Sequence, residues 1–220
     1  MADKNGQQSI VDSIRDTGLI AILRGVDSSG ICDIVEKMRQ KGIRLVEVTM
    51  DTPDALLLIR KLSSTFAGNM IIGAGTVLDP RSAHQAISAG AEFILAPSLD
   101  TEVIECCMEN GVLPIPGVFS PSEIALARKF GAIIVKVFPA SLLGAPYIKV
   151  ISKLFTDIDI LAVGGIDLNN VADFISAGAL GVGIGAKLVG RDIVDSQDYA
   201  LLGRRTEQYL QKILSAKLIN

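Results

Sequence analysis

The sequence is poor in the residue types that hold metals and form disulfides. Its 220 residues include a single histidine, His84, and three cysteines, Cys32, Cys106 and Cys107. An odd number of cysteines with no CxxC spacing and no neighbouring histidine argues against a disulfide framework and against a zinc site. The cysteines are expected to be reduced thiols in the core or on a helix face. We therefore expect no bound metal.

Charge of one sign and long apolar runs are also missing. The 21 Lys and Arg residues nearly balance 24 Asp and Glu, and the net charge of −3 excludes a strong attraction to nucleic acid or anionic membranes. Apolar residues make up 49% of the chain, but no run approaches the roughly 18 residues of a membrane span. The N-terminal residues lack the apolar segment of a secretory signal. These features predict a soluble, cytoplasmic protein.

Short apolar runs instead alternate with helical stretches along the whole chain. Each of five glycines, Gly42, Gly90, Gly111, Gly131 and Gly178, stands just before such a run, as expected where a helix ends and a strand begins. Helix-start signals precede the helical stretches at Ser28-Ser29, Thr52-Pro53, Asp79-Pro80, Asp100 and Ser120-Pro121. The predicted strands are residues 19–23, 43–49, 71–74, 92–96, 112–115, 133–137, 159–163 and 180–184.

Eight repeated strand–helix units predict an α/β fold, a (β/α)8 TIM barrel with a short N-terminal helix. Near-continuous apolar strands such as residues 133–135 are typical of parallel strands buried on both faces. An open, doubly wound sheet is the alternative. Because no linker or change of composition divides the chain, we expect one domain over residues 1–220. His84 is expected on the outer ring of helices, away from any chemistry.

Two charged residues lie within predicted apolar strands, whose C-terminal ends carry the chemistry in such barrels. A carboxylate at Glu47 is costly to bury unless it is paired or used, so it is a candidate acid/base. Burial of Lys136 lowers its pKa and leaves an amine that can attack a carbonyl, as in Schiff-base enzymes. The alternatives are structural: Glu47 paired with Arg24 or a lysine, and Lys136 paired with Glu47 or extended to the barrel rim.

Other strand ends carry groups suited to an anionic ligand. Arg24 ends the first strand and places a positive charge at the barrel mouth, unless it is only an ion-paired surface residue. Gly164-Gly165 and Gly185 follow the last two strands, where such barrels often bind phosphate, although tight turns use the same residues. Gly75 and Thr76 give a ligand access to backbone and hydroxyl groups. Together they predict a phosphorylated small-molecule substrate.

An ordered series of motifs gives the sequence a family resemblance. IAILRG, LVEVTMDTP, IGAGTVLDP, FILAPSLD, PIPGVFSPSE, VKVFPA and AVGGI occur in the order and spacing of the KDPG/KHG aldolases, from Ile20 to about Gly190. The resemblance implies class I aldolases of 2-keto-3-deoxy sugar acids, with a homotrimeric barrel and no cofactor. It implies Lys136 as the Schiff-base lysine and Glu47 as the general acid/base. The implied substrate contacts are Arg24, Gly75, Thr76, Pro97, Phe138, Gly164, Gly165 and Gly185.

The chain departs from the family pattern at two places. Asp51 stands where many members carry an arginine, so Arg24 is expected to supply the anion contact. Ala186, followed by Lys187, stands where a serine commonly helps to bind phosphate. Several phrases, such as VFPASLLGAPYIK, look closer to the branch that acts on 2-dehydro-3-deoxy-6-phosphogalactonate than to the gluconate branch.

The resulting prediction is cleavage of a 2-keto-3-deoxy-6-phosphosugar acid to pyruvate and glyceraldehyde 3-phosphate. One alternative is a phosphosugar isomerase or epimerase on the same type of barrel, which would use paired carboxylates or a metal. A second is a non-catalytic phosphosugar-binding barrel, which would keep the glycine loops but would not require Lys136.

Overall fold

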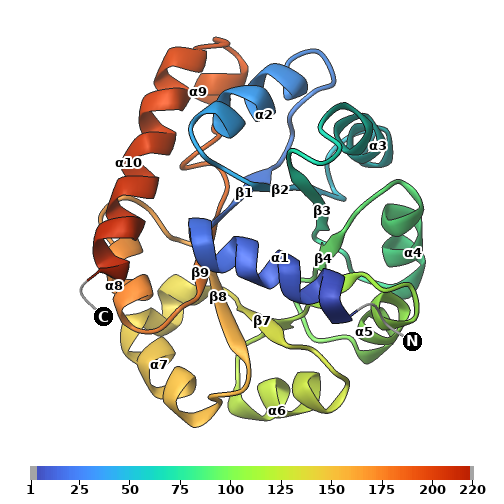
Figure 1. The fold of residues 1–220 in the computed structure, drawn as a ribbon, viewed down its shortest axis with the longest axis vertical. Helices are drawn as coiled ribbons and strands as arrows, with labels where there is room; N and C mark the ends of the chain where they lie inside the picture. Colours follow the sequence, from blue (N-terminus) through green and yellow to red (C-terminus); the bar gives the residue numbers. More distant parts are fainter. Residues whose placement is uncertain (1–3, 219–220) are drawn as a thin grey trace.

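The chain folds into a barrel of parallel strands surrounded by helices, as the computed structural model describes it for residues 4–218 (Figure 1). The strands follow one another around the barrel in the order β5-β4-β3-β2-β1-β9-β8-β7-β6, and all neighbouring pairs are parallel. The strands are β1 (Leu19–Leu23), β2 (Leu45–Thr49), β3 (Ile71–Gly75), β4 (Phe93–Leu95), β5 (Leu113–Ile115), β6 (Gly117–Val118), β7 (Ile134–Val137), β8 (Asp159–Val163) and β9 (Gly181–Ile184).

The fifth predicted strand, residues 112–115, corresponds to β5, and the short strand β6 that follows Pro116 was not predicted. Pro116 separates the two because it has no N–H to donate to a neighbouring strand. β5 pairs with β4, whereas β6 pairs with β7 through Gly117 and Lys136. The Lys136 N–H donates to the Pro116 carbonyl at 2.9 Å. Residues 113–118 therefore join the two ends of the sheet, and the predicted (β/α)8 barrel is confirmed.

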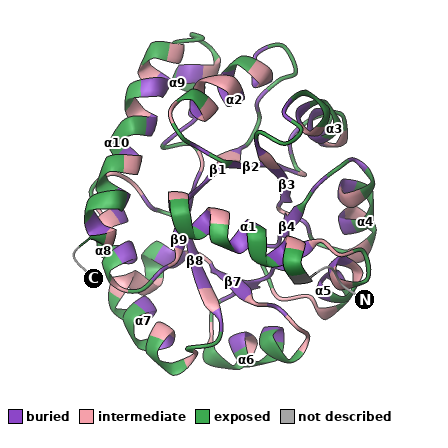
Figure 2. Cartoon of the chain, viewed as in Figure 1, coloured by how far each residue is buried: buried purple, intermediate pink, exposed green. Residues whose placement is uncertain are grey.

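The helices form a ring outside the strands, and their buried residues face inward (Figure 2). Two helices follow the last strand and were not assigned from the sequence, α9 (Arg191–Val194) and α10 (Tyr199–Lys217). The long α10 packs against α2 (Ile31–Gln40) and α8 (Val171–Ser176). The helices are α1 (Lys4–Thr17), α2 (Ile31–Gln40), α3 (Ala55–Thr65), α4 (Pro80–Ser88), α5 (Thr101–Glu109), α6 (Pro121–Lys129), α7 (Ala140–Leu154), α8 (Val171–Ser176), α9 (Arg191–Val194) and α10 (Tyr199–Lys217).

Three of the five predicted helix starts are confirmed. Asp79 and Asp100 accept hydrogen bonds from backbone N–H groups of the first turns of α4 and α5, and Ser120 forms a capping box with Glu123. The other two predictions were wrong about the cap, because α2 and α3 begin without a side-chain cap. All five glycines predicted to end helices have a positive φ, as that role requires.

Side chains pack on both faces of the sheet, in two separate cores. The larger core fills the space between strands and helices and includes Val46 and Val48. The smaller one fills the barrel lumen and includes Leu45 and Ile134. Because side chains alternate along a strand, residues two positions after Leu45 and Ile134 also face the lumen.

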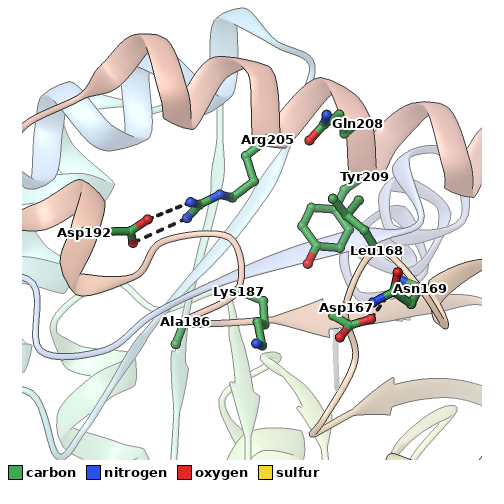
Figure 3. A pocket seen from close by; sticks show the side chains of 9 residues that line it. All are labelled: Asp167, Leu168, Asn169, Ala186, Lys187, Asp192, Arg205, Gln208 and Tyr209. Carbon is green, nitrogen blue, oxygen red and sulfur yellow. Dashed lines mark hydrogen bonds and ion pairs between the residues drawn. The ribbon is translucent and has the colours of Figure 1, made fainter.

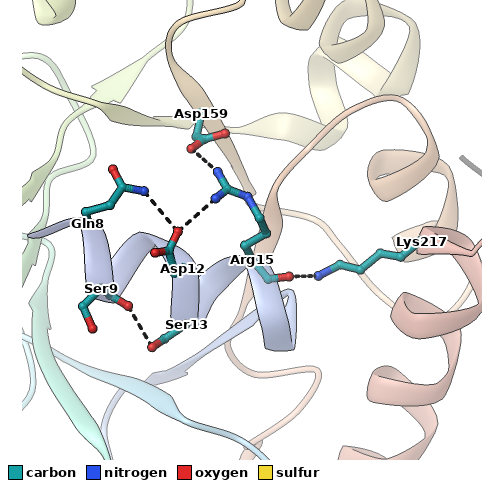
Figure 4. A network of polar contacts seen from close by, with 7 residues as sticks. All are labelled: Gln8, Ser9, Asp12, Ser13, Arg15, Asp159 and Lys217. Carbon is teal, nitrogen blue, oxygen red and sulfur yellow. Dashed lines mark hydrogen bonds and ion pairs between the residues drawn. The ribbon is translucent and has the colours of Figure 1, made fainter.

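Helix α1 closes the N-terminal end of the barrel, across which it lies in Figure 1. Its Ile10, Val11 and Ile14 belong to the lumen core. Arg15 forms an ion pair with Asp159 at the start of β8 (2.8 Å), and its carbonyl accepts a hydrogen bond from Lys217 of α10 (Figure 4). The opposite end, where the strands terminate, is left for chemistry.

The cysteines and the histidine lie on α2, α4 and α5, in the ring of helices. Cys32, Cys106 and Cys107 are free thiols, and burial raises the pKa of Cys107 to about 12, which makes it unreactive. His84 is exposed on α4, on the outer ring as predicted. No helix within residues 4–218 is long and apolar enough to cross a membrane.

Candidate active site

Glu47 points into the lumen from β2, two residues after Leu45. The residue is 1% exposed, and its Oε2 atom has no hydrogen-bond partner among the described residues. A buried carboxylate oxygen without a partner is costly, and such atoms are concentrated where a substrate or water completes the site. A purely structural ion pair would instead satisfy this atom. The geometry therefore favours the acid/base prediction over the structural alternative.

Lys136 points into the same lumen from β7, two residues after Ile134. It is 5% exposed, and its Nζ atom lies 4.8 Å from the centre of the Phe138 ring. Burial lowers the pKa of Lys136, and the positive charge of Arg24 lowers it further, although the negative charge of Glu47 opposes both effects. A lowered pKa increases the neutral fraction of the amine, which is the form that attacks a carbonyl.

Burial raises the pKa of Glu47 to about 7, although the charges of Lys136 and Arg24 act in the opposite direction. Near neutral pH the carboxyl group therefore exists in both protonation states and can accept or release a proton with little cost. Burial favours the uncharged form of both side chains, and the two share one buried space. This is the arrangement expected of an amine nucleophile and its acid/base partner.

Two glycines in β3 make room for side chains in the lumen: Gly75 for Glu47 and Gly73 for Phe93. A Cβ added to Gly75 would lie 2.4 Å from Glu47 Oε1, so any other residue would displace the carboxylate. A Cβ on Gly73 would clash with the Phe93 ring in the lumen in the same way. Gly75 is thus required for packing against the acid/base candidate, in addition to the ligand access expected from the sequence.

Arg24 lies at the mouth, beside Thr76. Its Nη2 donates to Thr76 Oγ1 at 2.9 Å, and its Nε is 3.6 Å from Asp51 Oδ2. Thr76 has a φ of 56°, which is strained for a residue other than glycine and typical of functional sites. Its hydroxyl oxygen accepts from Arg24, so its own proton remains free for a carboxylate. The structure brings these two predicted anion contacts together.

The Gly164-Gly165 loop after β8 lies close to the residues that follow β7. Both glycines have positive φ, and a Cβ on Gly164 would lie 3.0 Å from the Phe138 ring. A Cβ on Gly165 would lie 2.0 Å from the Ser141 hydroxyl oxygen. Asn170 donates to the Gly165 carbonyl at 3.0 Å and fixes the loop. The glycines are required by close packing, and they place a serine hydroxyl beside the predicted phosphate contacts.

The two remaining predicted contacts, Gly185 and Pro97, follow β9 and β4, which are separated by three strands in the sheet. A Cβ on Gly185, directly after β9, would make ordinary van der Waals contact with Ile22 at 3.6 Å. The Pro97 backbone follows β4 and packs against Gly117, where a Cβ would lie 2.3 Å from the Pro97 carbonyl carbon. Pro97 therefore lies one strand away from Lys136, the partner of Gly117 on β7.

A cavity of about 510 Å³ lies outside the barrel, beside the loops after β8 and β9 (Figure 3). Two of its lining residues, Arg205 and Asp192, form an ion pair, with 2.6 Å between Arg205 Nη2 and Asp192 Oδ2. Neither Glu47 nor Lys136 lines it, but Ala186, next to the predicted phosphate contact Gly185, does. Its lining comprises Asp167, Leu168, Asn169, Ala186, Lys187, Asp192, Arg205, Gln208 and Tyr209.

Sequence reasoning missed three polar residues that shape the mouth. Ser141 and Asn170 contact the Gly165 loop, and the Thr52 hydroxyl accepts a hydrogen bond from the Gly25 N–H at 3.0 Å. Thr52 had been assigned to a helix start, and Ser141 follows the Phe-Pro-Ala segment after Lys136. Ser141 lies in the first turn of α7, shortly after the end of β7, and this position was the only available signal. No group of three or more potential metal ligands occurs within residues 4–218.

The comparisons with known proteins agree with this geometry. The family model for KDPG and KHG aldolase matches residues 10–204. The chain belongs to the KDPG/KHG aldolase family. As a member of this family it is a lyase, a class I aldolase, and the two alternatives, a phosphosugar isomerase or epimerase and a non-catalytic phosphosugar-binding barrel, are not favoured.

Named relatives include both branches of the aldolase family. The chain is 32% identical to 2-dehydro-3-deoxy-phosphogluconate aldolase of Pseudomonas aeruginosa over 199 aligned residues. The aligned region covers 90% of each chain. It is 33% identical over 171 residues to 2-dehydro-3-deoxy-6-phosphogalactonate aldolase of Escherichia coli, covering 77% of this chain and 83% of that one. These similar identities do not separate the gluconate branch from the galactonate branch.

A solved family structure adds the chemistry of the intermediate. The chain superposes with a TM-score of 0.84 on KDPG aldolase from Legionella pneumophila, which is 27% identical. The superposition covers 90% of this chain and 96% of that one. The Legionella enzyme was captured with pyruvate as a covalent carbinolamine, the species that forms when an amine attacks the keto group.

Proposed function

We propose that this aldolase cleaves a 2-keto-3-deoxy-6-phosphosugar acid reversibly to pyruvate and glyceraldehyde 3-phosphate, with Lys136 as the nucleophile. The observation that carries this proposal is the pair of buried, lumen-facing side chains of Lys136 and Glu47. The pKa of Lys136 is lowered and that of Glu47 is raised to about 7. The relatives named for phosphogluconate and phosphogalactonate substrates support this substrate class.

The neutral amine of Lys136 attacks the keto carbon, and the carbinolamine loses water to form an iminium ion. The C3–C4 bond then breaks, and its electron pair moves into the iminium group to give an enamine. Glu47, acting through a water molecule, takes the proton of the C4 hydroxyl as the aldehyde forms. It returns a proton to C3 of the enamine, and hydrolysis of the resulting imine releases pyruvate and the free amine.

The two ends of the substrate are assigned to different loops. The carboxylate is received by Arg24, Thr76 and the backbone of Gly75, and the phosphate by Gly164, Gly165 and Gly185. Ser141 supplies a hydroxyl next to Gly165, although Ala186 lacks one. Pro97 and Phe138 line the path between the ends. The strand order β7-β8-β9 supports this division, since it makes the loops that follow these strands neighbours.

We further propose that residues 1–220 form one barrel domain and that the enzyme is a homotrimer without a cofactor. Exposed apolar side chains on α7 are suited to a subunit contact, because Leu142, Val150 and Leu154 are each more than half exposed in the single chain.

Borohydride trapping tests the nucleophile. Pyruvate and sodium borohydride should add one reduced pyruvyl group to the protein, at Lys136 only, because reduction makes the imine permanent. Peptide mass spectrometry locates the group. Lys136→Ala should take up none, whereas the control Lys129→Ala, changed on the exposed side of α6, should be labelled like the wild-type enzyme. An adduct at another lysine, or none, would refute the assignment.

A further inference from the structure

Asp51 is the acidic residue that departs most clearly from the family pattern, and it lies against Arg24. The two side chains approach to 3.6 Å between Arg24 Nε and Asp51 Oδ2. On its other side Arg24 donates to Thr76 Oγ1 at 2.9 Å. The guanidinium is thus held between the loops that follow β2 and β3.

Buried hydrogen bonds fix the loop that carries Asp51. The Thr49 and Thr52 hydroxyl oxygens are 3.0 Å apart, and both residues are buried. The Thr52 hydroxyl also accepts from the Gly25 N–H at 3.0 Å, which joins this loop to the residue that follows Arg24. The Met50 N–H donates to the Gly75 carbonyl at 2.8 Å. The chain on both sides of Asp51 is therefore held, and its side chain, which is 50% exposed, is a contact for the Arg24 side chain, which is 61% exposed.

We propose that Asp51 is a positioning residue for the carboxylate of the keto acid: it holds Arg24 beside Thr76, where the guanidinium and the Thr76 hydroxyl receive that carboxylate. The inference rests on the proposed aldolase function and adds a residue to its binding site. An arginine has five N–H donors, so the contacts with Asp51 and Thr76 leave donors for a substrate. A guanidinium held in place loses less conformational entropy when the substrate binds.

The same arrangement predicts that the effect of Asp51 changes sign when Arg24 is removed. Beside Arg24, the carboxylate of Asp51 improves substrate binding by orienting the guanidinium. Without Arg24, it is an uncompensated negative charge near an anionic substrate and repels it. A residue that only stabilises the fold would have the same effect in both backgrounds.

Deuterium exchange into the pyruvate methyl group, followed by proton NMR, tests this role at the carboxylate end alone. The exchange needs the imine and the enamine but no phosphorylated aldehyde. Asp51→Asn should raise KM for pyruvate about two- to fivefold, the range expected for an exposed ion pair, and leave the maximal exchange rate unchanged. Asp51→Glu should restore most of the affinity. The control Asp54→Asn makes the same charge change in the same loop and should leave KM unaltered.

The double variant gives the sharper result. In the Arg24→Ala background, Asp51→Asn should lower KM for pyruvate. An unchanged or decreased KM in the single variant, a loss confined to the maximal rate, or an effect on KM for the phosphorylated aldehyde alone would overturn the inference. So would an increase of equal size in both backgrounds. If the wild-type enzyme shows neither exchange nor borohydride trapping, the aldolase proposal itself fails, and the positioning role fails with it.

Discussion

The carboxyl group of Glu47 is held where both of its protonation states are accessible. Its pKa is raised to about 7 by burial, and its Oε2 atom has no partner in the described part of the chain. In the proposed mechanism the same group removes one proton and returns another. A group with a pKa near the working pH performs both transfers more efficiently than an exposed carboxylate would.

Glu47→Gln should therefore lower kcat by about 10² or more, with a smaller change in KM. The amide has a similar shape but cannot take up the hydroxyl proton. Steady-state cleavage kinetics would measure the effect, and borohydride trapping with pyruvate would confirm that Lys136 remains accessible. Near-normal turnover in this variant would assign Glu47 to a structural role.

Glu47 and Lys136 were predictable from the sequence because a charge inside an apolar strand is rare and needs a reason. The contacts at the mouth were less predictable. Thr76 accepts from Arg24, and Ser141 packs against Gly165, through side-chain geometry between loops that are distant in sequence. Periodicity assigns a residue to a strand end, but it does not determine which neighbouring loop its side chain contacts.

Most strands and helices were predictable because the local signals are strong. Apolar runs mark the strands, and the capping side chains of Asp79, Asp100 and Ser120 mark helix starts. The structure gives a physical reason why the two predicted caps of α2 and α3 are absent. The N-cap position of α2 is Gly30, which has no side chain, and that of α3 is Asp54, while the Thr52 hydroxyl accepts from the Gly25 N–H instead.

The loops after β8 and β9 predict a preference for phosphorylated substrate. Backbone N–H groups in glycine loops stabilise a dianion better than a hydroxyl group. The hydroxyl of Ser141 offers a further donor that partly replaces the one missing at Ala186. The comparison is of kcat/KM for 2-keto-3-deoxy-6-phosphogalactonate, its gluconate epimer and the unphosphorylated acids. Equal values with and without phosphate would contradict the phosphate site, whereas equal values for the epimers would show only that C4 configuration is not distinguished.

Helix α1 contributes to stability from the end of the barrel opposite the chemistry. Ile14 is fully buried in the lumen core, so Ile14→Ala should lower the free energy of unfolding by about 2–5 kcal/mol. Urea denaturation measures this loss. Leu57→Ala removes a similar side chain that is 63% exposed on α3, and it should cost about 0.5 kcal/mol or less. If the two variants lose equal stability, α1 does not close the barrel as described.

At the scale of the whole molecule, the barrel separates stability from catalysis. The lumen is apolar at the end closed by α1 and contains Glu47 and Lys136 toward the strand ends. Burying these charged groups costs stability, which the apolar packing of two cores offsets. The cost should appear in the pH dependence of unfolding, because it depends on whether Glu47 is ionised.

The folded-state pKa of Glu47, about 7, lies above its ordinary value of 4.5. Below pH 4.5 the group is protonated in both states and its burial costs little. Between pH 4.5 and 7 it ionises in the unfolded chain but not in the folded one, so the folded state loses stability as pH rises. Above pH 7 the loss is constant, on the order of 3 kcal/mol.

Glu47→Gln should consequently increase the free energy of unfolding more at pH 8 than at pH 5, because glutamine carries no charge to bury at either pH. Urea denaturation of both proteins at the two pH values gives the difference. Glu105→Gln, an exposed change on α5, should shift stability equally at both. A gain from Glu47→Gln that is the same at both pH values would mean that Glu47 is not desolvated in the folded barrel. Burial would then not be the reason for a Glu47 pKa near 7, and the proposed proton transfers by Glu47 would need a different explanation.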